Sequence, residues 1–319
     1  MEIVLKLAII ILGFTFLIKG ADFLVEGAAA LAKRLSVSQI VIGLTVVSFG
    51  TSAPELIVNI LASIQGKSDI TLGNVIGSNI INILLILGIA GVIRPILTEK
   101  NTVWREIPFS LLAVLALFIA CNDHFLDGGE NVISRGEGML FMLFFIIFIT
   151  YTFAISGIEF RDQEQIKTLS PIRIMMYITI GLAGLIAGGK LVVDNAIAVA
   201  RMLEVSEKVI GLTVIAIGTS LPELFTSAVA AFKGKSDIAI GNIVGSNIFN
   251  IFFILSISAV IRPIPFIVQL NVDIAVLIMA SLMLFLTMFI GNVRKLDRGE
   301  SIIFLVFYAL YFIFLMIRK

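Results

Sequence analysis

The hexapeptide Gly50-Thr51-Ser52-Ala53-Pro54-Glu55 occurs twice in the chain, the second time as Gly218-Thr219-Ser220-Leu221-Pro222-Glu223. Both copies belong to a longer duplication, because Gly43–Pro95 aligns with Gly211–Pro263 without a gap at a shift of 168 residues. Of the 53 aligned positions, 31 are identical. A repeat of this length and identity predicts that the chain is built from two similar structural units.

The composition is that of a membrane protein. Of the 319 residues, 59% are apolar and 14% are charged, whereas soluble domains carry about 25% charged residues, so an ordinary soluble enzyme is excluded. The net charge of +1 excludes an electrostatic nucleic-acid binder. One cysteine and one histidine exclude an internal disulfide and a zinc site with a histidine pair. The apolar residues form blocks long enough to cross a bilayer, approximately at 3–30, 38–64, 70–93, 106–121, 137–156, 172–201, 208–232, 238–261, 270–290 and 301–317.

These blocks predict an all-α polytopic membrane protein with ten transmembrane helices. Five spans per repeat is an odd number, so the second repeat must enter the membrane inverted relative to the first. We expect residues 1–160 to form the first repeat, 161–171 a connecting loop and 172–319 the second repeat, within one integral membrane domain. Thirteen loop Lys and Arg residues fall on one side and eight on the other. The positive-inside rule therefore predicts a cell-membrane protein with both termini extracellular.

The two acids of the repeated hexapeptide lie within segments that are predicted to cross the apolar interior of the membrane. Glu55 and Glu223 each fall about halfway along an apolar block, where a charged side chain costs about 2.5–3.5 kcal/mol on insertion scales. No Lys or Arg lies at comparable depth in these spans. A duplication without function is the alternative, but it gives no reason for polar residues to be identical there. The sequence therefore predicts that a bound metal cation compensates the two acids.

Oxygen-bearing residues surround each acid at helical spacing. Pro54 and Pro222 lack an N–H, so the carbonyls of Gly50 and Gly218 lose their helical partners and the helix is disturbed. A broken helix at membrane depth is tolerated where it is buried or lines a cavity. Residues three or four apart share one helix face, and here that face carries Ser48, Thr51, Ser52, Glu55 and Asn59 in the first copy and Ala216, Thr219, Ser220, Glu223 and Ser227 in the second.

The next span of each repeat adds amides and hydroxyls. The motif Gly-Ser-Asn-x-x-Asn occurs in both spans, and steps of four align Asn74, Ser78 and Asn82 in one copy and Asn242, Ser246 and Asn250 in the other. Hydrogen-bonding between helices is an alternative role for any single Asn or Ser. Carboxylate, carbonyl, hydroxyl and amide oxygens suit Ca²⁺. Na⁺ accepts the same oxygens, and without Cys or His nearby a soft metal is not expected.

At these two motifs the chain resembles the cation/calcium exchanger superfamily, specifically a prokaryotic member of its sodium/calcium exchanger branch. The resemblance implies that the second, third, seventh and eighth helices pack around the ions and that the long first and sixth helices slide past the core to alternate access. It also implies that Asn82 and Asn250 line the centre, and that potassium is not cotransported, because potassium-dependent relatives have Asp at the position of Asn250. The implied calcium ligands are Glu55, Glu223 and the carbonyls of Thr51 and Thr219, and sodium uses these together with Ser52, Ser78, Ser220, Ser246 and the carbonyls of Ser48 and Ala216.

The function predicted from these features is a secondary antiporter that exchanges Na⁺ for Ca²⁺ by alternating access. Its partners would be the two ions and the lipid bilayer, with no nucleic acid and no prosthetic group, and a monomer would suffice. A proton/calcium antiporter of the same fold is the alternative. A calcium channel is disfavoured because channel filters are usually rings from repeated subunits. An enzyme is not expected, because the spans carry no nucleophile–base pair and no metal–histidine set.

Overall fold

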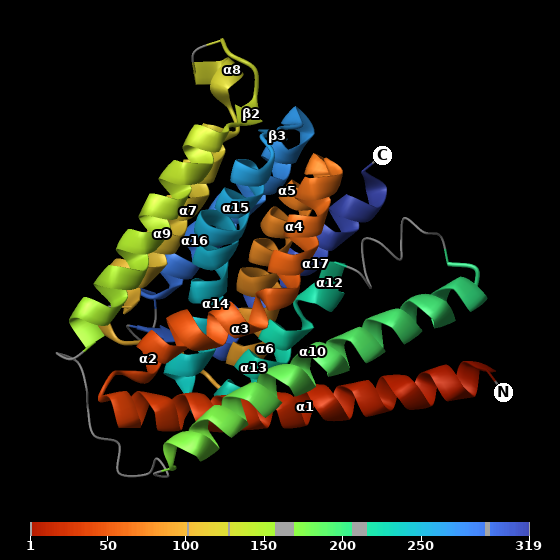
Figure 1. Cartoon of the computed structure of the whole chain (residues 1–319), viewed down its shortest axis with the longest axis vertical. Coiled ribbons are helices and arrows are strands. Elements are labelled where there is room, and N and C mark those ends of the chain that lie inside the picture. The colour runs from red at the N-terminus through yellow and green to blue at the C-terminus, as the bar shows by residue number, and fades with distance from the viewer. Residues whose placement is uncertain are drawn as a thin grey trace.

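The computed structural model describes residues 2–100, 102–126, 128–156, 169–205, 216–290 and 294–318, and nearly all of this chain is helical (Figure 1). In the first half the helices are α1 (Glu2–Leu35), α2 (Gln39–Ile42), α3 (Ser48–Thr51), α4 (Ala53–Gln65), α5 (Ser68–Ile80), α6 (Leu87–Ile93), α7 (Ile107–Ala120), α8 (Asp123–Leu126) and α9 (Arg135–Ser156). In the second half they are α10 (Pro171–Met202), α12 (Ala216–Thr219), α13 (Leu221–Phe232), α14 (Ser236–Ile248), α15 (Leu255–Ile261), α16 (Asn271–Thr287) and α17 (Arg298–Ile317).

Shorter elements join these helices. The π-helical turns are η1 (Gly43–Val47), η2 (Ile81–Ile86), η3 (Thr102–Glu106) and η5 (Phe249–Ile254), and η6 (Val268–Leu270) is a 3-10 turn. The strands are β1 (Ile96–Leu97), β2 (Val132–Ile133), β3 (Ile264–Pro265) and β4 (Lys295–Leu296). Because η2 continues α5 into α6 and η5 continues α14 into α15, each set forms one long span.

The spans confirm a multi-pass helical membrane fold. Within the described ranges, eight helices are long and apolar enough to cross a bilayer, and α2–α3 with α4 forms a ninth span that is bent by 49°. The predicted span 208–232 is represented by the shorter apolar helices α12 and α13. Its first residues lie outside the described part of the chain, so the count of ten stays a prediction.

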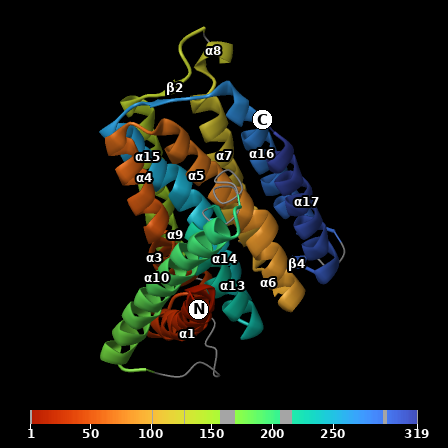
Figure 2. The same cartoon turned by 90° about the vertical axis from the view of Figure 1, so that its right-hand side faces the viewer.

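The strand pairs show that the repeats are inverted. β1 and β3 occupy equivalent positions in the two repeats, but β1 pairs with β4 while β3 pairs with β2, both antiparallel. The β2–β3 pair lies at the upper end of the helix bundle, whereas β4, and so its partner β1, lies at the lower end (Figures 1 and 2). Equivalent segments therefore reach opposite ends of the molecule, as inverted repeats require.

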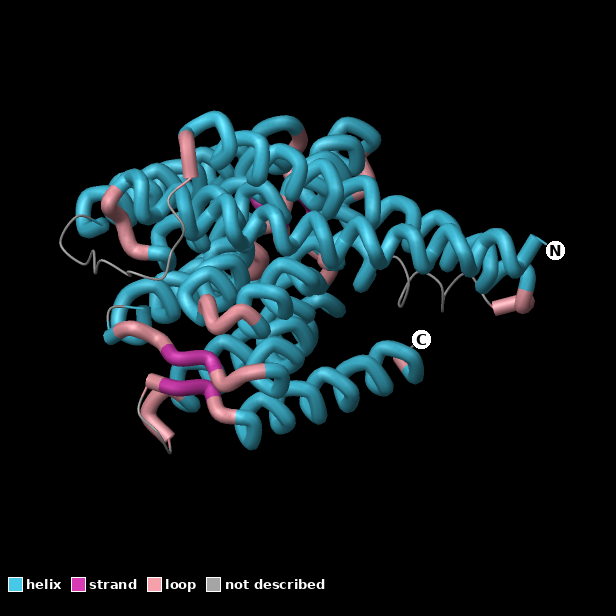
Figure 3. The backbone as a smooth tube through the Cα atoms, turned by 90° about the horizontal axis from the view of Figure 1, so that it is seen from below, coloured by secondary structure: helices cyan, strands magenta, loops and turns pink. Residues whose placement is uncertain are grey.

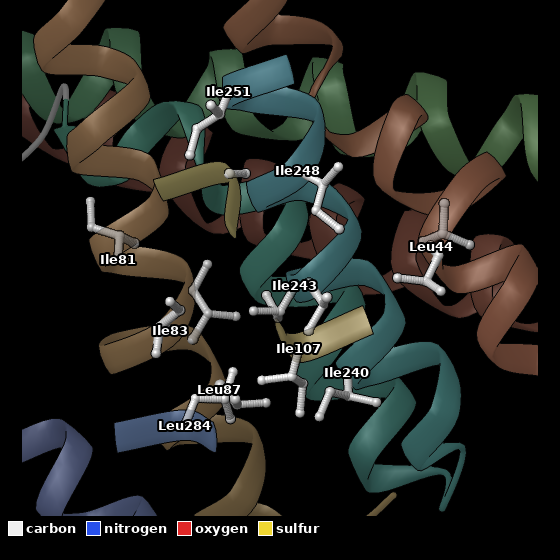
Figure 4. Close-up of a cluster of buried hydrophobic side chains, with 14 of the residues drawn as sticks. Leu44, Ile81, Ile83, Leu87, Ile107, Ile240, Ile243, Ile248, Ile251 and Leu284 are labelled. Carbon is white, nitrogen blue, oxygen red and sulfur yellow. The ribbon is translucent and has the colours of Figure 1, made fainter. Parts of the chain in front are cut away.

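The α5–α6 and α14–α15 spans form the centre of the molecule. In an 18-residue apolar stretch of each span, 72% and 83% of the residues, respectively, are buried. Aliphatic side chains from both repeats fill the space between them. Ile83 and Leu87 point toward Ile240 and Ile243 across this interface (Figure 4). A span surrounded by protein can carry polar groups on one face that a lipid-facing span cannot, and this explains why the Asn-rich motifs occur here.

The long helices α1 and α10 lie side by side and cross the other helices at a steep angle. The N-terminal end of α1 extends beyond the core (Figures 1 and 3). Glycines allow the two backbones to approach closely. A Cβ atom on Gly181 would lie 2.7 Å from the backbone N of Leu24, and one on Gly20 would lie 2.8 Å from the carbonyl O of Gly181. No larger residue fits these positions without separating the helices.

A lysine of the second repeat attaches to α1 of the first repeat. Lys233, directly after α13, forms ion pairs with Asp22 and Glu26 of α1, the latter at 3.0 Å from Nζ to Oε1. Partial burial lowers the pKa of Lys233, but the two carboxylates outweigh it and the pKa lies above its ordinary value. The equivalent position in the first repeat is the neutral Gln65, so this link exists at one end only.

The glycine contact between α1 and α10 gives a stability prediction. We expect Gly181→Ala to lower the free energy of unfolding by about 1–3 kcal/mol, because the added Cβ overpacks against the backbone of α1. The measurement is the midpoint of thermal unfolding in detergent. Gly189→Ala on the same helix is the matched control, since a Cβ there meets no described atom within 4 Å. An equal loss of stability in both variants would contradict the close contact.

Candidate functional site

The helix breaks predicted at the repeated hexapeptides are present in both repeats. Ser52 has φ −83° and ψ 8°, outside helical geometry, and Ser220 has φ −88° and ψ 8°. A new helix begins directly after each serine, with a proline in its first turn. Glu55 and Glu223 therefore lie in the first turn of α4 and α13, where the helix dipole favours a carboxylate.

Each glutamate is held by a serine of the opposite repeat. Ser52 Oγ donates to Glu223 Oε1 at 2.8 Å, and Ser220 Oγ donates to Glu55 Oε1 at 3.4 Å. Both glutamates are 1% exposed. This reciprocal pairing places the two acids together at the interface between the repeats, where the sequence predicted a shared site.

The same interface contains buried side-chain oxygen atoms that receive no hydrogen bond from the described residues. Glu55 Oε2, Glu223 Oε2, Asn82 Oδ1 and Asn250 Oδ1 are buried and have no hydrogen-bond partner among the described residues. An ionised carboxylate can only accept, and a buried charge without a partner is costly. In the described ranges no set of three or more His, Cys, Asp or Glu side chains could hold a metal. Any cation bound here would instead be held by two carboxylates and neutral oxygens.

The remaining predicted residues lie at different distances from this centre. Ser246 Oγ lies 3.0 Å from Ser52 Oγ, within hydrogen-bonding distance, so it belongs to the glutamate cluster. Ser48 Oγ donates to its own helix, at Leu44 O. Ser78 is buried on α5, but in the described structure its hydroxyl bonds neither glutamate. Ala216 begins α12, and the structure describes its backbone only.

The two predicted threonines differ in their bonding. Thr51 Oγ1 donates to Asn242 Oδ1 at 3.0 Å, and Asn242 Nδ2 in turn donates to Ser227 Oγ at 3.0 Å. At the equivalent place in the other repeat, Thr219 Oγ1 and Asn74 Nδ2 are both without a hydrogen-bond partner among the residues that the structure places. The Thr–Asn contact is therefore made once and not twice.

Two further residues at the site were absent from the predicted set. Asn79 and Asn247 are almost fully buried and bond the amides of Asn250 and Asn82. The sequence carried a signal for them, because both are the Asn of the repeated Gly-Ser-Asn motif and both are polar within an apolar span.

Comparison with known proteins identifies the family. Residues 5–154 and 174–317 match the family described as sodium/calcium exchanger protein. The sodium/calcium exchanger MaX1 of Methanosarcina acetivorans is 33% identical over 98% of this chain and 99% of its own. The protein belongs to the sodium/calcium exchanger family. This confirms the resemblance to the exchanger branch and its prokaryotic members, and the family is one of membrane transporters.

Other members of the exchanger family agree with the fold. The putative antiporter CaxA of Alkalimonas amylolytica is 35% identical over 87% of this chain and 88% of its own. A solved structure of the sodium-calcium exchanger NCX_Mj, soaked with 10 mM Na⁺ and zero Ca²⁺, superimposes with a TM-score of 0.83 at 34% identity and covers 97% of this chain and 98% of that one. Further NCX_Mj structures were soaked with Ca²⁺ or Sr²⁺.

Within this exchanger fold the described residues at the starts of α14 and α5 are packed differently. At the end where α14 begins, Gly241 and Gly245 pack against α2 and η1, and a Cβ on Gly245 would lie 2.7 Å from Leu44 O. Gly241 is buried, whereas the equivalent Gly73 of α5 is exposed. Among the residues that the structure describes, the start of α14 is therefore more closely packed than the start of α5.

This asymmetry predicts unequal reactivity of two equivalent positions. In a Cys121→Ala background that removes the single native thiol, we expect Asn74→Cys to react with a water-soluble maleimide faster than Asn242→Cys, because Asn74 is half-buried and Asn242 is buried. The rates are measured on detergent-solubilised protein. Phe125→Cys in the exposed α8 turn gives the upper limit of the rate. Equal rates at positions 74 and 242 would contradict the difference in packing between the starts of α5 and α14.

Proposed function

We propose that this protein is a secondary active antiporter that exchanges Na⁺ for Ca²⁺ across the cell membrane by alternating access, with ions bound between Glu55 and Glu223. The observation that carries the proposal is the reciprocal bonding of the two glutamates by Ser220 and Ser52, which leaves one oxygen of each carboxylate buried and unpartnered. Family membership supports the transport of cations.

The donor set favours calcium. Two carboxylates balance the charge of one Ca²⁺, which takes about six to eight oxygen ligands. The proposed calcium ligands are Glu55, Glu223 and the carbonyls of Thr51 and Thr219. Sodium has a lower charge and is coordinated by the same kinds of oxygen atom, so several Na⁺ ions can replace one Ca²⁺ in overlapping positions. The proposed sodium ligands add Ser52, Ser78, Ser220, Ser246 and the carbonyls of Ser48 and Ala216, with Asn82 and Asn250 lining the centre.

Electrostatics would couple the two ions. An empty site leaves two buried carboxylates uncompensated, and this opposes passage through a closed, dry intermediate. Only a loaded site then changes sides readily. If more than two Na⁺ exchange for one Ca²⁺, net charge crosses the membrane, and each elementary charge contributes about 2.3 kcal/mol per 100 mV.

Alternating access would exchange two equivalent contacts. The Thr51–Asn242 hydrogen bond is made at the end where α14 begins, while at the other end Thr219 Oγ1 and Asn74 Nδ2 have no hydrogen-bond partner among the described residues. Formation of the second contact and loss of the first would expose the ions to the opposite side. We propose that α1 and α10 slide as one unit during this step, and that both chain termini are extracellular. All proposed ligands belong to one chain, so a monomer would suffice within the bilayer.

The glutamates provide the direct test. We expect Glu55→Gln and Glu223→Gln to reduce gradient-driven ⁴⁵Ca²⁺ uptake into liposomes to background, because an amide cannot balance the charge of the ion. The matched control is Asp273→Asn, which alters a buried acid of α16 that is already bonded by Tyr311 and Arg318. Full flux in either glutamine variant would show that ions bind elsewhere.

A second measurement identifies the coupling ion. We expect ⁴⁵Ca²⁺ uptake to follow an outward Na⁺ gradient and to be unaffected by K⁺, because Asn250 offers an amide in place of a carboxylate. The gradients of Na⁺, K⁺ and H⁺ are imposed one at a time on the same proteoliposomes. Uptake driven by H⁺ alone would replace the sodium assignment with a proton/calcium antiporter of the same fold.

A further inference from the structure

Four asparagines form a hydrogen-bond network between the two central spans. Asn82 Nδ2 donates to Asn247 Oδ1 at 3.0 Å, and Asn250 Nδ2 donates to Asn79 Oδ1 at 2.8 Å. Asn79 Nδ2 donates to the backbone carbonyl of Asn247 at 3.3 Å. Each of the four side chains is at most 1% exposed. Every bond joins the first repeat to the second, so the network lies at the same interface as the glutamates.

The network fixes which end of each amide stays free. A side-chain amide has a donor end, NH₂, and an acceptor end, the carbonyl oxygen. In Asn82 and Asn250 the donor end is engaged by Asn247 and Asn79, and the oxygen is buried without a partner. If either amide rotated by 180°, its NH₂ group would take the place of that oxygen. A cation is attracted by the oxygen and repelled by the NH₂ group.

The backbone contributes to the same arrangement. Asn82 lies in η2 and Asn250 lies in η5, the two equivalent π-helical turns of the central spans. Such turns interrupt the regular progression of side chains around a helix and occur often at functional sites. Asn79 and Asn247 lie within the last turn of the preceding α-helices, α5 and α14. Each therefore acts from a regular helix on an amide of the irregular turn in the other repeat.

We propose that Asn79 and Asn247 are positioning residues for cation binding, which hold Asn250 and Asn82 with their carbonyl oxygens toward the ions. This inference rests on the proposed function, since it assumes that the cations bind at this interface. Residues that orient a ligand without touching the metal typically contribute about 10–100-fold to metal affinity. Asn79 and Asn247 are expected to have effects in this range.

The primary test measures calcium affinity. We expect Asn79→Leu and Asn247→Leu, which keep the approximate volume of the side chain, to raise the calcium Kd about 10–100-fold. The Kd is measured by isothermal titration calorimetry on the full chain in detergent, with CaCl₂ as the titrant. Unchanged Kd values in both variants would overturn the proposal. Asn79→Ala and Asn247→Ala, which add no apolar bulk, serve if a leucine variant fails to fold.

A crossed pair of double mutants separates orientation from packing. Asn250→Asp presents oxygen atoms in either orientation, so it needs no positioning. Asn79→Leu should therefore have little effect on the calcium Kd in an Asn250→Asp background and its full effect in an Asn82→Asp background. Asn247→Leu should show the reverse pattern. Equal losses in both backgrounds would mean that the asparagines act through packing alone, and the proposal would be wrong.

The outcome is distinguishable from failure of the proposed function. If Glu55→Gln and Glu223→Gln bind calcium like the unmodified protein, the cation site lies elsewhere and both proposals fail. If these variants lose binding while Asn79→Leu and Asn247→Leu keep it, only the positioning role is wrong. The choice between Na⁺ and H⁺ as coupling ion does not affect the comparison, because all variants are titrated in the same sodium-free buffer at one pH.

Discussion

The structure depends on two carboxylates that are buried at the contact between inverted repeats. Glu55 and Glu223 are each bonded by a serine from the other half of the chain, and each keeps one oxygen without a donor. The ion pairs found among the described residues involve other acids, on α1, on α16 and beside β4. The helix breaks directly precede the two glutamates, and Ser246 of a central span joins their hydrogen-bond cluster. A fold that did not have to accommodate it would have no reason to interrupt two spans at membrane depth.

Much of the architecture follows from the sequence because its causes are local. Blocks of apolar residues define the spans, and Pro54 and Pro222 define the breaks, since a proline cannot supply the N–H that a continuous helix needs. Glu55 and Glu223 were identifiable because a charge within an apolar block requires an explanation. The inversion followed from the odd number of spans per repeat, and the strand pairs confirm it. Apart from the inversion, which depends on the repeat, these arguments concern residues close together in the chain.

The parts that could not be predicted concern contacts between distant segments. Helical spacing places Ser52 beside Glu55, but its hydroxyl bonds Glu223, 171 residues away. The amide network has the same character, because the Gly-Ser-Asn motif indicates that Asn79 and Asn247 are unusual without indicating their partners. The π-helical turns also had no visible signal in the sequence. The difference between the two Thr–Asn contacts is the hardest of these features to predict from the sequence. Thr51 and Thr219 are identical, as are Asn74 and Asn242, so their different bonding reflects the conformation of the chain.

The unequal Thr–Asn contacts also matter for the alternating access that we propose. If the repeats were identical, the observed conformation and its inverted counterpart would have the same free energy, and neither would be preferred. The two repeats differ at residues that affect the relative free energy of the two conformations. Lys233 joins α13 to Asp22 and Glu26 of α1 at the end where α14 begins, while Gln65 at the other end carries no charge to form such a pair. Ser227 accepts a bond from Asn242 beside the Thr51–Asn242 contact, whereas Asn59 in its place bonds the backbone of Glu55. These differences favour one conformation over its inverted counterpart, so under the alternating access that we propose, ion binding would supply the difference in free energy each time the site changes sides.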